Sequence, residues 1–296
     1  MRLDAKTVRK YFDGISEKGL QEFRDFLSSH PLKFADYKGT SVPYYILGDG
    51  EKTILTFSGG HSGPWALYST ALGFAKEFRM VVVDLNSCHN LDDLSGRVDH
   101  VLHLEGIDRV SLMGQSLSGI FAQAYFRRNV DRVEAMVLTN TLAPQKERNK
   151  KAALAIFRTV PSFLLIPLLK NKLGKMGKID MPITPEIEER LRIRMAILRH
   201  DMDHVASKKA LLSVIRMIFE FNEKDDKAME NIDRWPGKVL IVTSEDEPYR
   251  KDVESLKNHY PQSQIFSFPA GCGHAAPMVH REKFQRLVRS FLLDEA

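Results

Sequence analysis

A serine stands between an apolar run and a helical segment in the stretch RVSLMGQSLSGIFAQAYF, residues 109–126. A serine hydroxyl is a weak nucleophile. It attacks a carbonyl effectively only when a base removes its proton and donors hold the resulting oxyanion. Serine is also a favoured helix N-cap, so the GQSLSG turn alone leaves two interpretations of Ser116 open. Nucleophilic catalysis requires that the same chain also supply a base and an acid.

Candidates for both groups occur near the end of the chain. His274 lies in GCGHAAP, just after the apolar run QIFSF, and TSEDEP places Asp246 and Glu247 just after the run VLIV. An imidazole held by a carboxylate can take the serine proton and later return it to the leaving group. With these partners, the nucleophile interpretation of Ser116 is favoured over the N-cap interpretation.

Strand and helix signals alternate around these residues. Short apolar runs typical of buried strands occur at 53–57, 80–85, 109–113, 132–140, 238–243 and 264–268. Segments with helical character occur at 65–78, 91–104, 117–129, 253–260 and 281–293. Such alternation predicts a mostly parallel sheet with helices on both faces. Ligands bind beyond the carboxyl ends of the strands in such sheets, where Ser116, Asp246 and His274 are expected to lie.

The alternation stops near residue 143. Residues 145–235 read as several helices broken at four prolines, Pro161, Pro167, Pro182 and Pro185. An all-helical insertion between two strands of a sheet predicts a lid over the strand ends. We therefore divide the chain into an N-terminal helical extension at 1–31, a core formed by 32–144 and 236–296, and a helical lid, or cap, at 145–235. The extension could cover a sheet edge or mediate a dimer, so a monomer and a homodimer both stay open.

In three motifs the chain resembles the α/β-hydrolase superfamily, in the branch with a serine nucleophile and a helical lid. GQSLSG resembles the nucleophile elbow GxSxG, FSGGHSG the oxyanion loop after the third strand, and GCGHAAP the histidine loop. The order serine, acid, histidine also matches, and the resemblance extends from about residue 42 to residue 293. It implies an α/β fold with a mostly parallel central sheet, helices on both faces and a helical cap inserted after the sixth strand.

The resemblance assigns a role to each matching residue. Ser116 would be the nucleophile, and His274 would be the general base that later acts as an acid. The backbone N–H groups of Leu117 and Gly60 would form the oxyanion hole, with His61 as the alternative to Gly60.

The sequence departs from the superfamily pattern at the acid and at the elbow. The motif usually written GSEDP selects Asp246, whereas alignment on Pro248 selects Glu247. We prefer Asp246, because a shorter carboxylate after a strand is the commoner partner of a triad imidazole, and we keep Glu247 as the alternative. In the elbow, Ser118 stands where glycine is usual, with Gly119 beside it. The small size of Ser118 predicts that the tight turn is tolerated.

These features predict a serine hydrolase that cleaves an acyl ester or related carbonyl substrate through an acyl-enzyme intermediate, as carboxylesterases do, with no cofactor and no metal. The expected substrate is a small molecule with an apolar acyl chain, because the lid segment AIFRTVPSFLLIPLLKNKLG is rich in apolar side chains. A non-catalytic adaptor on the same fold is the alternative, since VLTNTL and PSFLLIPLL are similar to the maspardin group. A C–C bond hydrolase is a further alternative.

Composition further narrows the class of protein, its location and its partners. The 296-residue chain has two cysteines and no CxxC pair, which indicates free thiols rather than a disulfide framework or a cysteine metal site. The N-terminus is too charged for a signal peptide, and no apolar run approaches the roughly 18 residues of a membrane span. We therefore expect a cytoplasmic protein. No nucleic-acid-binding motif occurs, so nucleic acid is not an expected partner.

Two remaining features have a functional and a plain structural interpretation. Much of the net charge of +5 comes from basic residues between 145 and 180, where we expect a solvated helical face, with weak membrane-surface contact as the alternative. RHDMDH places His200 and His204 one helical turn apart, as in HExxH zinc sites. Because Asp201 replaces the glutamate and no third ligand is evident, we interpret this segment as an exposed face of a lid helix.

Overall fold

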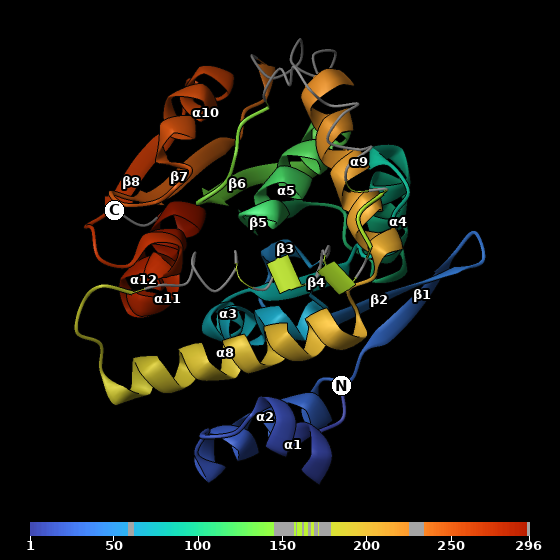
Figure 1. The fold of residues 1–296 in the computed structure, drawn as a ribbon. Coiled ribbons are helices and arrows are strands. Elements are labelled where there is room, and N and C mark those ends of the chain that lie inside the picture. The colour runs from blue at the N-terminus through green and yellow to red at the C-terminus, as the bar shows by residue number, and fades with distance from the viewer. Residues whose placement is uncertain are drawn as a thin grey trace.

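The computed structural model describes residues 1–58, 62–144, 179–224 and 234–294, together with scattered residues between 157 and 171. Its centre is a sheet of order β1-β2-β4-β3-β5-β6-β7-β8 (Figure 1). β2 is antiparallel to both of its neighbours, and the remaining pairings are parallel. The strands are β1 (Lys33–Tyr37), β2 (Thr40–Leu47), β3 (Thr53–Ser58), β4 (Arg79–Asp84), β5 (Val110–Gln115), β6 (Val133–Thr139), β7 (Lys238–Ser244) and β8 (Gln264–Phe268).

Helices cover both faces of this sheet, which explains why its central strands are apolar on both sides. Leu55 and Phe57 of β3 pack in one core cluster with α4, α5 and α10, whereas Ile54 packs in the other with α3, α11 and α12. The core helices are α3 (Tyr68–Phe74), α4 (Leu91–Leu104), α5 (Leu117–Arg128), α10 (Val253–His259), α11 (Ala276–Val279) and α12 (Arg281–Leu293). The predicted mostly parallel sheet between two helical layers is confirmed.

In the described part of the insertion between β6 and β7, two cap helices are present, as predicted for an insertion after the sixth strand. They are α8 (Pro185–His204) and α9 (Lys208–Lys224). Pro185 is the first residue of α8 and Thr184 is its N-cap, with its hydroxyl accepting a hydrogen bond from the N–H of Ile187. This proline therefore begins a helix, the position where a missing N–H costs nothing. Among the described residues, no helix is long and apolar enough to cross a membrane.

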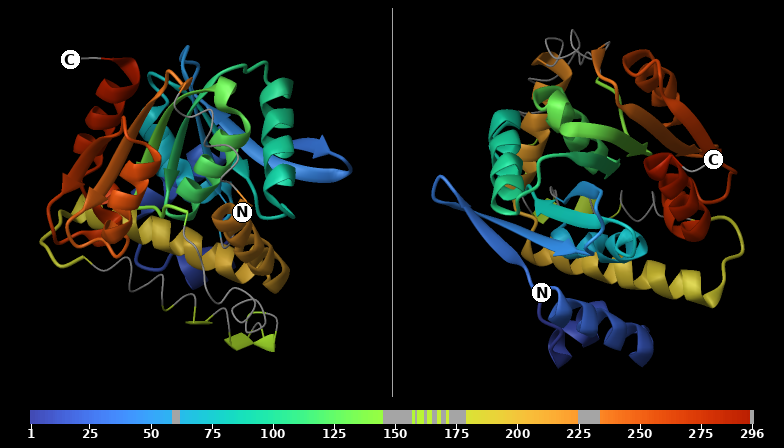
Figure 2. Two further views of the ribbon diagram at one scale, coloured as in Figure 1. Left: turned by 90° about the horizontal axis from the view of Figure 1, so that it is seen from above. Right: turned by 180° about the vertical axis from the view of Figure 1, so that it is seen from behind.

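The N-terminal helices α1 (Ala5–Tyr11) and α2 (Glu17–Ser29) lie against α8, on the side away from the sheet (Figures 1 and 2). The hydroxyl of Tyr11 donates to Asp203, and the N–H of Ser16 donates to Glu189, each at 2.8 Å. Phe23 of α2 is fully buried, with its ring centroid 4.8 Å from that of Tyr68. The extension thus holds the cap helix onto the core, a role that neither sequence alternative named.

Candidate active site

Ser116 sits at a strained turn between β5 and α5. Its φ of 57° and ψ of −123° place a non-glycine residue at positive φ, a conformation that persists only when the surroundings enforce it and that clusters at functional sites. The surroundings here are specific. The Ser116 N–H donates to the carbonyl of Thr139 at 3.0 Å, and the Thr141 hydroxyl donates to the Ser116 carbonyl at 2.6 Å.

The alternative that Ser116 is an ordinary N-cap is wrong. Ser116 precedes α5, yet its side chain makes no capping hydrogen bond, and its backbone is not in the extended conformation that N-caps adopt. By contrast, Thr184 before α8 has ψ of 155° and a capping bond. The turn therefore presents the Ser116 side chain to the cavity at the end of β5 rather than to the helix terminus.

Small residues on both sides make this turn sterically feasible. A Cβ added to Gly114 would lie 2.5 Å from the Ser118 carbonyl oxygen, and one added to Gly119 would lie 2.5 Å from the Thr141 hydroxyl. Ser118 meets no such obstacle, and its hydroxyl accepts a bond from the N–H of Phe57 at 3.3 Å. The close helix packing thus falls on Gly119, which accounts for a serine at the usual glycine position.

The structure pairs His274 with Glu247 and not with Asp246, the residue that the sequence favoured. Both carboxylate oxygens of Glu247 lie 3.0 Å from Nδ1 of His274. The Glu247 side chain is fully buried, and that of His274 is 16% exposed. A buried carboxylate on Nδ1 fixes the ring and directs Nε2 outward as the basic nitrogen.

Asp246 instead organises the loop that carries the histidine. Its carboxylate accepts hydrogen bonds from the N–H groups of Gly271 and Gly273 at 2.9 and 3.0 Å, and from the Ser244 hydroxyl at 3.1 Å. Desolvation alone would raise the pKa of Asp246, but these bonds lower it overall. The shorter side chain reaches the loop amides, whereas the next residue, one methylene longer, reaches the imidazole. The preference for Asp246 was therefore wrong, and the alternative register is the one that the structure shows.

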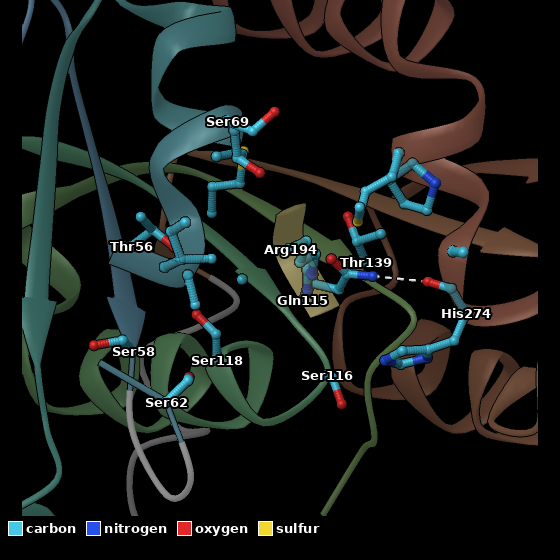
Figure 3. Close-up of a pocket in the computed structure, with 18 of the residues that line it drawn as sticks. Thr56, Ser58, Ser62, Ser69, Gln115, Ser116, Ser118, Thr139, Arg194 and His274 are labelled. Atoms are coloured by element: carbon cyan, nitrogen blue, oxygen red, sulfur yellow. Dashed lines mark hydrogen bonds between the residues drawn. The ribbon is translucent and has the colours of Figure 1, made fainter. Parts of the chain in front are cut away.

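Further polar side chains fix the backbone of the histidine. Gln115 Nε2 donates to the His274 carbonyl at 2.9 Å, which is the dashed line in Figure 3, and Asn140 Nδ2 donates to the same oxygen at 3.3 Å. Gln115 directly precedes Ser116, so one side chain links the elbow to the histidine loop. No sequence motif marks Gln115 as a site residue.

The candidate oxyanion-hole residues are partly described. Leu117 begins α5, so its N–H is among those that have no acceptor within the helix. Gly60 and His61 lie outside the described residues. The following residues are anchored: the Gly63 N–H donates to Asp201 of α8 at 2.8 Å, and Asn86 Nδ2 donates to the Ser62 carbonyl at 2.8 Å. The cap helix and the segment after β4 therefore both hold the end of the FSGGHSG loop.

Ser116 and His274 line one cavity of about 370 Å³ (Figure 3). Its walls come from the ends of β3 and β5, from α3, from the α11–α12 segment and from α8. Apolar side chains cover much of it, including Leu191, Met195 and Leu198 of the cap helix. A cavity of this size suits a small-molecule ligand. Three arginines also line this wall, Arg190, Arg194 and Arg281, and no sequence motif marked them.

The RHDMDH segment is exposed only in part. Asp201 is 2% exposed, and its carboxylate accepts from the Gly63 N–H while lying 3.1 Å from His200 Nδ1. His204 lies 3.2 Å from the Tyr11 hydroxyl. In the described part of the chain, no three histidine, cysteine or acidic residues gather in a metal-binding group. The motif connects α8 to the active-site loop and to α1, and the expected exposed face holds for Arg199, Asp203 and His204 but not for Asp201. The predicted free thiols, Cys88 and Cys272, are both buried.

No protein-family model and no curated protein matches the sequence. Solved structures do match. An enol-lactonase from Burkholderia xenovorans is 19% identical, with a TM-score of 0.66, and the match covers 88% of this chain and 100% of that one. An esterase from Exiguobacterium antarcticum is 16% identical, with a TM-score of 0.68 and coverage of 88% and 99%. A meta-cleavage product hydrolase from Pseudomonas fluorescens is 19% identical, with a TM-score of 0.64 and coverage of 89% and 98%.

These likenesses extend over nearly the whole length of each relative. Together with the strand order and the helical insertion after β6, they show that the chain has the α/β-hydrolase fold. The fold predicted from the three motifs is thereby confirmed. Because this scaffold hosts many reactions, the activity has to be argued from the site.

Proposed function

We propose that the protein is a serine hydrolase that cleaves a carboxylic ester or a related acyl compound through an acyl-enzyme intermediate. One observation carries the proposal. His274 is held at Nδ1 by both oxygens of Glu247, and its side chain opens into the same cavity as the strained turn of Ser116. Nucleophile, base and orienting acid thus come from the ends of β5, β8 and β7, the arrangement that serine hydrolysis needs.

In the proposed reaction, Ser116 Oγ attacks the carbonyl carbon while Nε2 of His274 takes the hydroxyl proton. The Glu247 carboxylate stabilises the imidazolium that forms, and the N–H of Leu117 donates to the oxyanion, with Gly60 or His61 as the second expected donor. Collapse of the tetrahedral intermediate breaks the C–O bond, and His274 returns the proton to the leaving alcohol. Water then attacks the acyl-enzyme with His274 again as the base, releasing the acid and free Ser116.

Intact-mass labelling with a fluorophosphonate tests this proposal. We expect one adduct on the wild-type protein, none on Ser116→Ala, and turnover of p-nitrophenyl butyrate by the wild type alone. Ser118→Ala, which changes a neighbouring cavity hydroxyl, is the matched control and should still label. An adduct that persists in Ser116→Ala would contradict the proposed nucleophile.

The same measurements separate the two alternatives. A folded wild-type protein with neither adduct nor turnover would favour a non-catalytic adaptor on this fold. An adduct without ester turnover, together with cleavage of a vinylogous diketone, would favour C–C bond hydrolysis. The intact pairing of His274 with Glu247 favours an active enzyme over the adaptor, since an adaptor needs no buried carboxylate on that ring.

A further inference from the structure

Arg194 is a cation in the cavity wall. It lies on α8, lines the cavity that also contains Ser116 and His274, and appears among the labelled side chains of Figure 3. Within the described part of the chain, no hydrogen bond or ion pair of its guanidinium is found. Burial lowers the pKa of Arg194, and no charged neighbour contributes to that shift.

The spacing of charges on α8 explains why Arg194 has no ion pair within this helix. Arg190 and Arg192 each pair with a glutamate four residues earlier on α8, Glu186 and Glu188. The residue four positions before Arg194 is Arg190, another cation. On α8, Arg190 and Arg192 thus each have a glutamate partner, whereas Arg194 has none within the helix; Arg190 and Arg194 both line the cavity.

Arg194 is half-buried, and a cation that is partly removed from water is stabilised by an anionic partner. The cavity wall offers none, since no aspartate or glutamate occurs among its described lining residues. Two more cations line the cavity: Arg190, which pairs with Glu186, and Arg281, which donates to the Ser69 carbonyl at 3.2 Å. The wall therefore has an excess of positive charge that a bound ligand could balance.

Two buried hydroxyls complete the polar part of the cavity. Ser58 and Thr139 are 4% and 2% exposed and line the cavity. Their hydroxyls have no hydrogen-bond partner in the described structure. Buried hydroxyls are normally hydrogen-bonded, so these two can also bind a polar group of a ligand or a water molecule. An apolar wall with a guanidinium and a few unpaired hydroxyls fits a small apolar molecule that bears one anionic group.

We propose that Arg194 is a specificity-determining residue that binds a carboxylate of the substrate, so that the preferred substrate is an acyl compound with a free carboxylate in addition to the bond that is cleaved. This inference rests on the hydrolase activity proposed above. A guanidinium donates two parallel hydrogen bonds to a carboxylate. Arg194 shares the cavity wall with Leu191, Met195 and Leu198, a combination that suits an apolar molecule with a carboxylate.

Kinetics with a matched pair of esters test the proposal. Mono-p-nitrophenyl adipate carries a free carboxylate, and its methyl ester is the neutral analogue. We expect wild-type kcat/KM to favour the acid about 10- to 100-fold, the range associated with a hydrogen bond to a charged group. Arg194→Met should remove this preference and leave the methyl ester within about threefold. Arg199→Met, on an exposed position of the same helix, is the matched control and should keep the wild-type ratio.

Equal turnover of the two esters by the wild type, or a preference that survives in Arg194→Met, would overturn the carboxylate site while leaving the hydrolase proposal intact. Absence of both turnover and a fluorophosphonate adduct would instead contradict the hydrolase proposal. In that case calorimetric titration with monomethyl adipate still tests the site. Binding that is lost in Arg194→Met supports it, and no binding to the wild type overturns it.

Two more measurements separate a carboxylate site from a phosphate site and from a purely structural arginine. Phenyl phosphate that binds the wild type more tightly than monomethyl adipate, and in an Arg194-dependent way, would overturn the carboxylate assignment in favour of a phosphate. The melting temperature distinguishes binding from a structural role. Because Arg194→Met removes a half-buried charge that has no acidic partner among the described residues, it should leave the melting temperature unchanged or raise it, whereas a fall would indicate that the arginine supports the fold.

Discussion

Glu247 and His274 form a buried pair in which both carboxylate oxygens lie 3.0 Å from the same ring nitrogen. Asp246, the residue before Glu247, instead accepts hydrogen bonds from the backbone amides of Gly271 and Gly273. The two adjacent acids thus have different roles. One orients the imidazole, and the other shapes the loop on which that imidazole is carried.

Glu247→Gln should therefore impair catalysis far more than folding. An amide cannot stabilise the imidazolium and can select the wrong tautomer, so we expect kcat for p-nitrophenyl butyrate to fall by about 10³- to 10⁴-fold. Asp246→Asn should keep more of the activity and lower the melting temperature instead, because it weakens charge-assisted bonds to the loop. The opposite pattern, with Asp246→Asn the slower enzyme at an unchanged melting temperature, would return the acid role to Asp246.

Asp201 should act as a positioning residue for the FSGGHSG loop. It reaches from the cap helix to the Gly63 N–H at 2.8 Å and is 2% exposed. Asp201→Ala leaves that N–H without its acceptor, so we expect kcat to fall by about 10- to 100-fold with a smaller change in KM. Asp201→Asn keeps an oxygen in place and should recover part of the rate. Asp203→Asn changes a more exposed acid of the same helix and should leave kcat near the wild-type value. A larger change in KM than in kcat would assign Asp201 to substrate binding instead.

Gly119→Ala should disrupt the elbow. The added methyl would lie 2.5 to 2.8 Å from three atoms of Thr141, whose hydroxyl holds the Ser116 carbonyl. Overpacking of this kind costs about 1–3 kcal/mol, and we expect that loss in chemical denaturation together with a reduced kcat. Ser118→Ala adds no atoms and should stay close to the wild type in both measurements. Wild-type stability of Gly119→Ala would show that the helix can move away from Thr141 at little cost.

Local sequence signals predicted the elements well because their apolar periods are strong. The expected helix at 91–104 and the strand at 264–268 coincide with α4 and β8. Local signals do not determine which side chains meet in the folded protein, because that depends on tertiary packing. Asp246 and Glu247 are adjacent acids in one loop, and only the folded chain determines which of them meets the imidazole.

The cap helix α8 was hardest to interpret from the sequence, because charged residues occur all around it. The N-terminal helices contact one side of it through Tyr11 and Ser16, and the active-site loop contacts Asp201. Polar residues therefore occur on buried sides as well as exposed ones, and periodicity no longer separates the two. Arg194 looks like its neighbours in the sequence, and only the folded chain shows that it lines the cavity with Ser116 and His274.

Asp84 should make the stability of the protein depend on pH. This residue, at the end of β4, is 7% exposed, and its carboxylate accepts two bonds from Asn86 at 2.8 and 2.7 Å. Desolvation raises the pKa of Asp84 to about 6, with a further contribution from Asp201, against the lowering effect of Asn86 and Arg97. Between the unfolded pKa near 3.8 and the folded value near 6, the native state binds more protons than the unfolded state. The contribution of Asp84 to the free energy of unfolding therefore falls as pH rises through this window.

Asp84→Asn stays neutral at every pH and keeps an oxygen for the Asn86 donors, so it should not suffer this loss. We expect its free energy of unfolding, relative to the wild type, to increase between pH 4 and pH 7 by up to about 3 kcal/mol. Urea denaturation of both proteins at several pH values measures this difference, and Asp49→Asn, at an exposed loop position, serves as the control. A difference between Asp84→Asn and the wild type that is flat over this range would mean that Asp84 ionises in the folded protein as readily as in the unfolded chain.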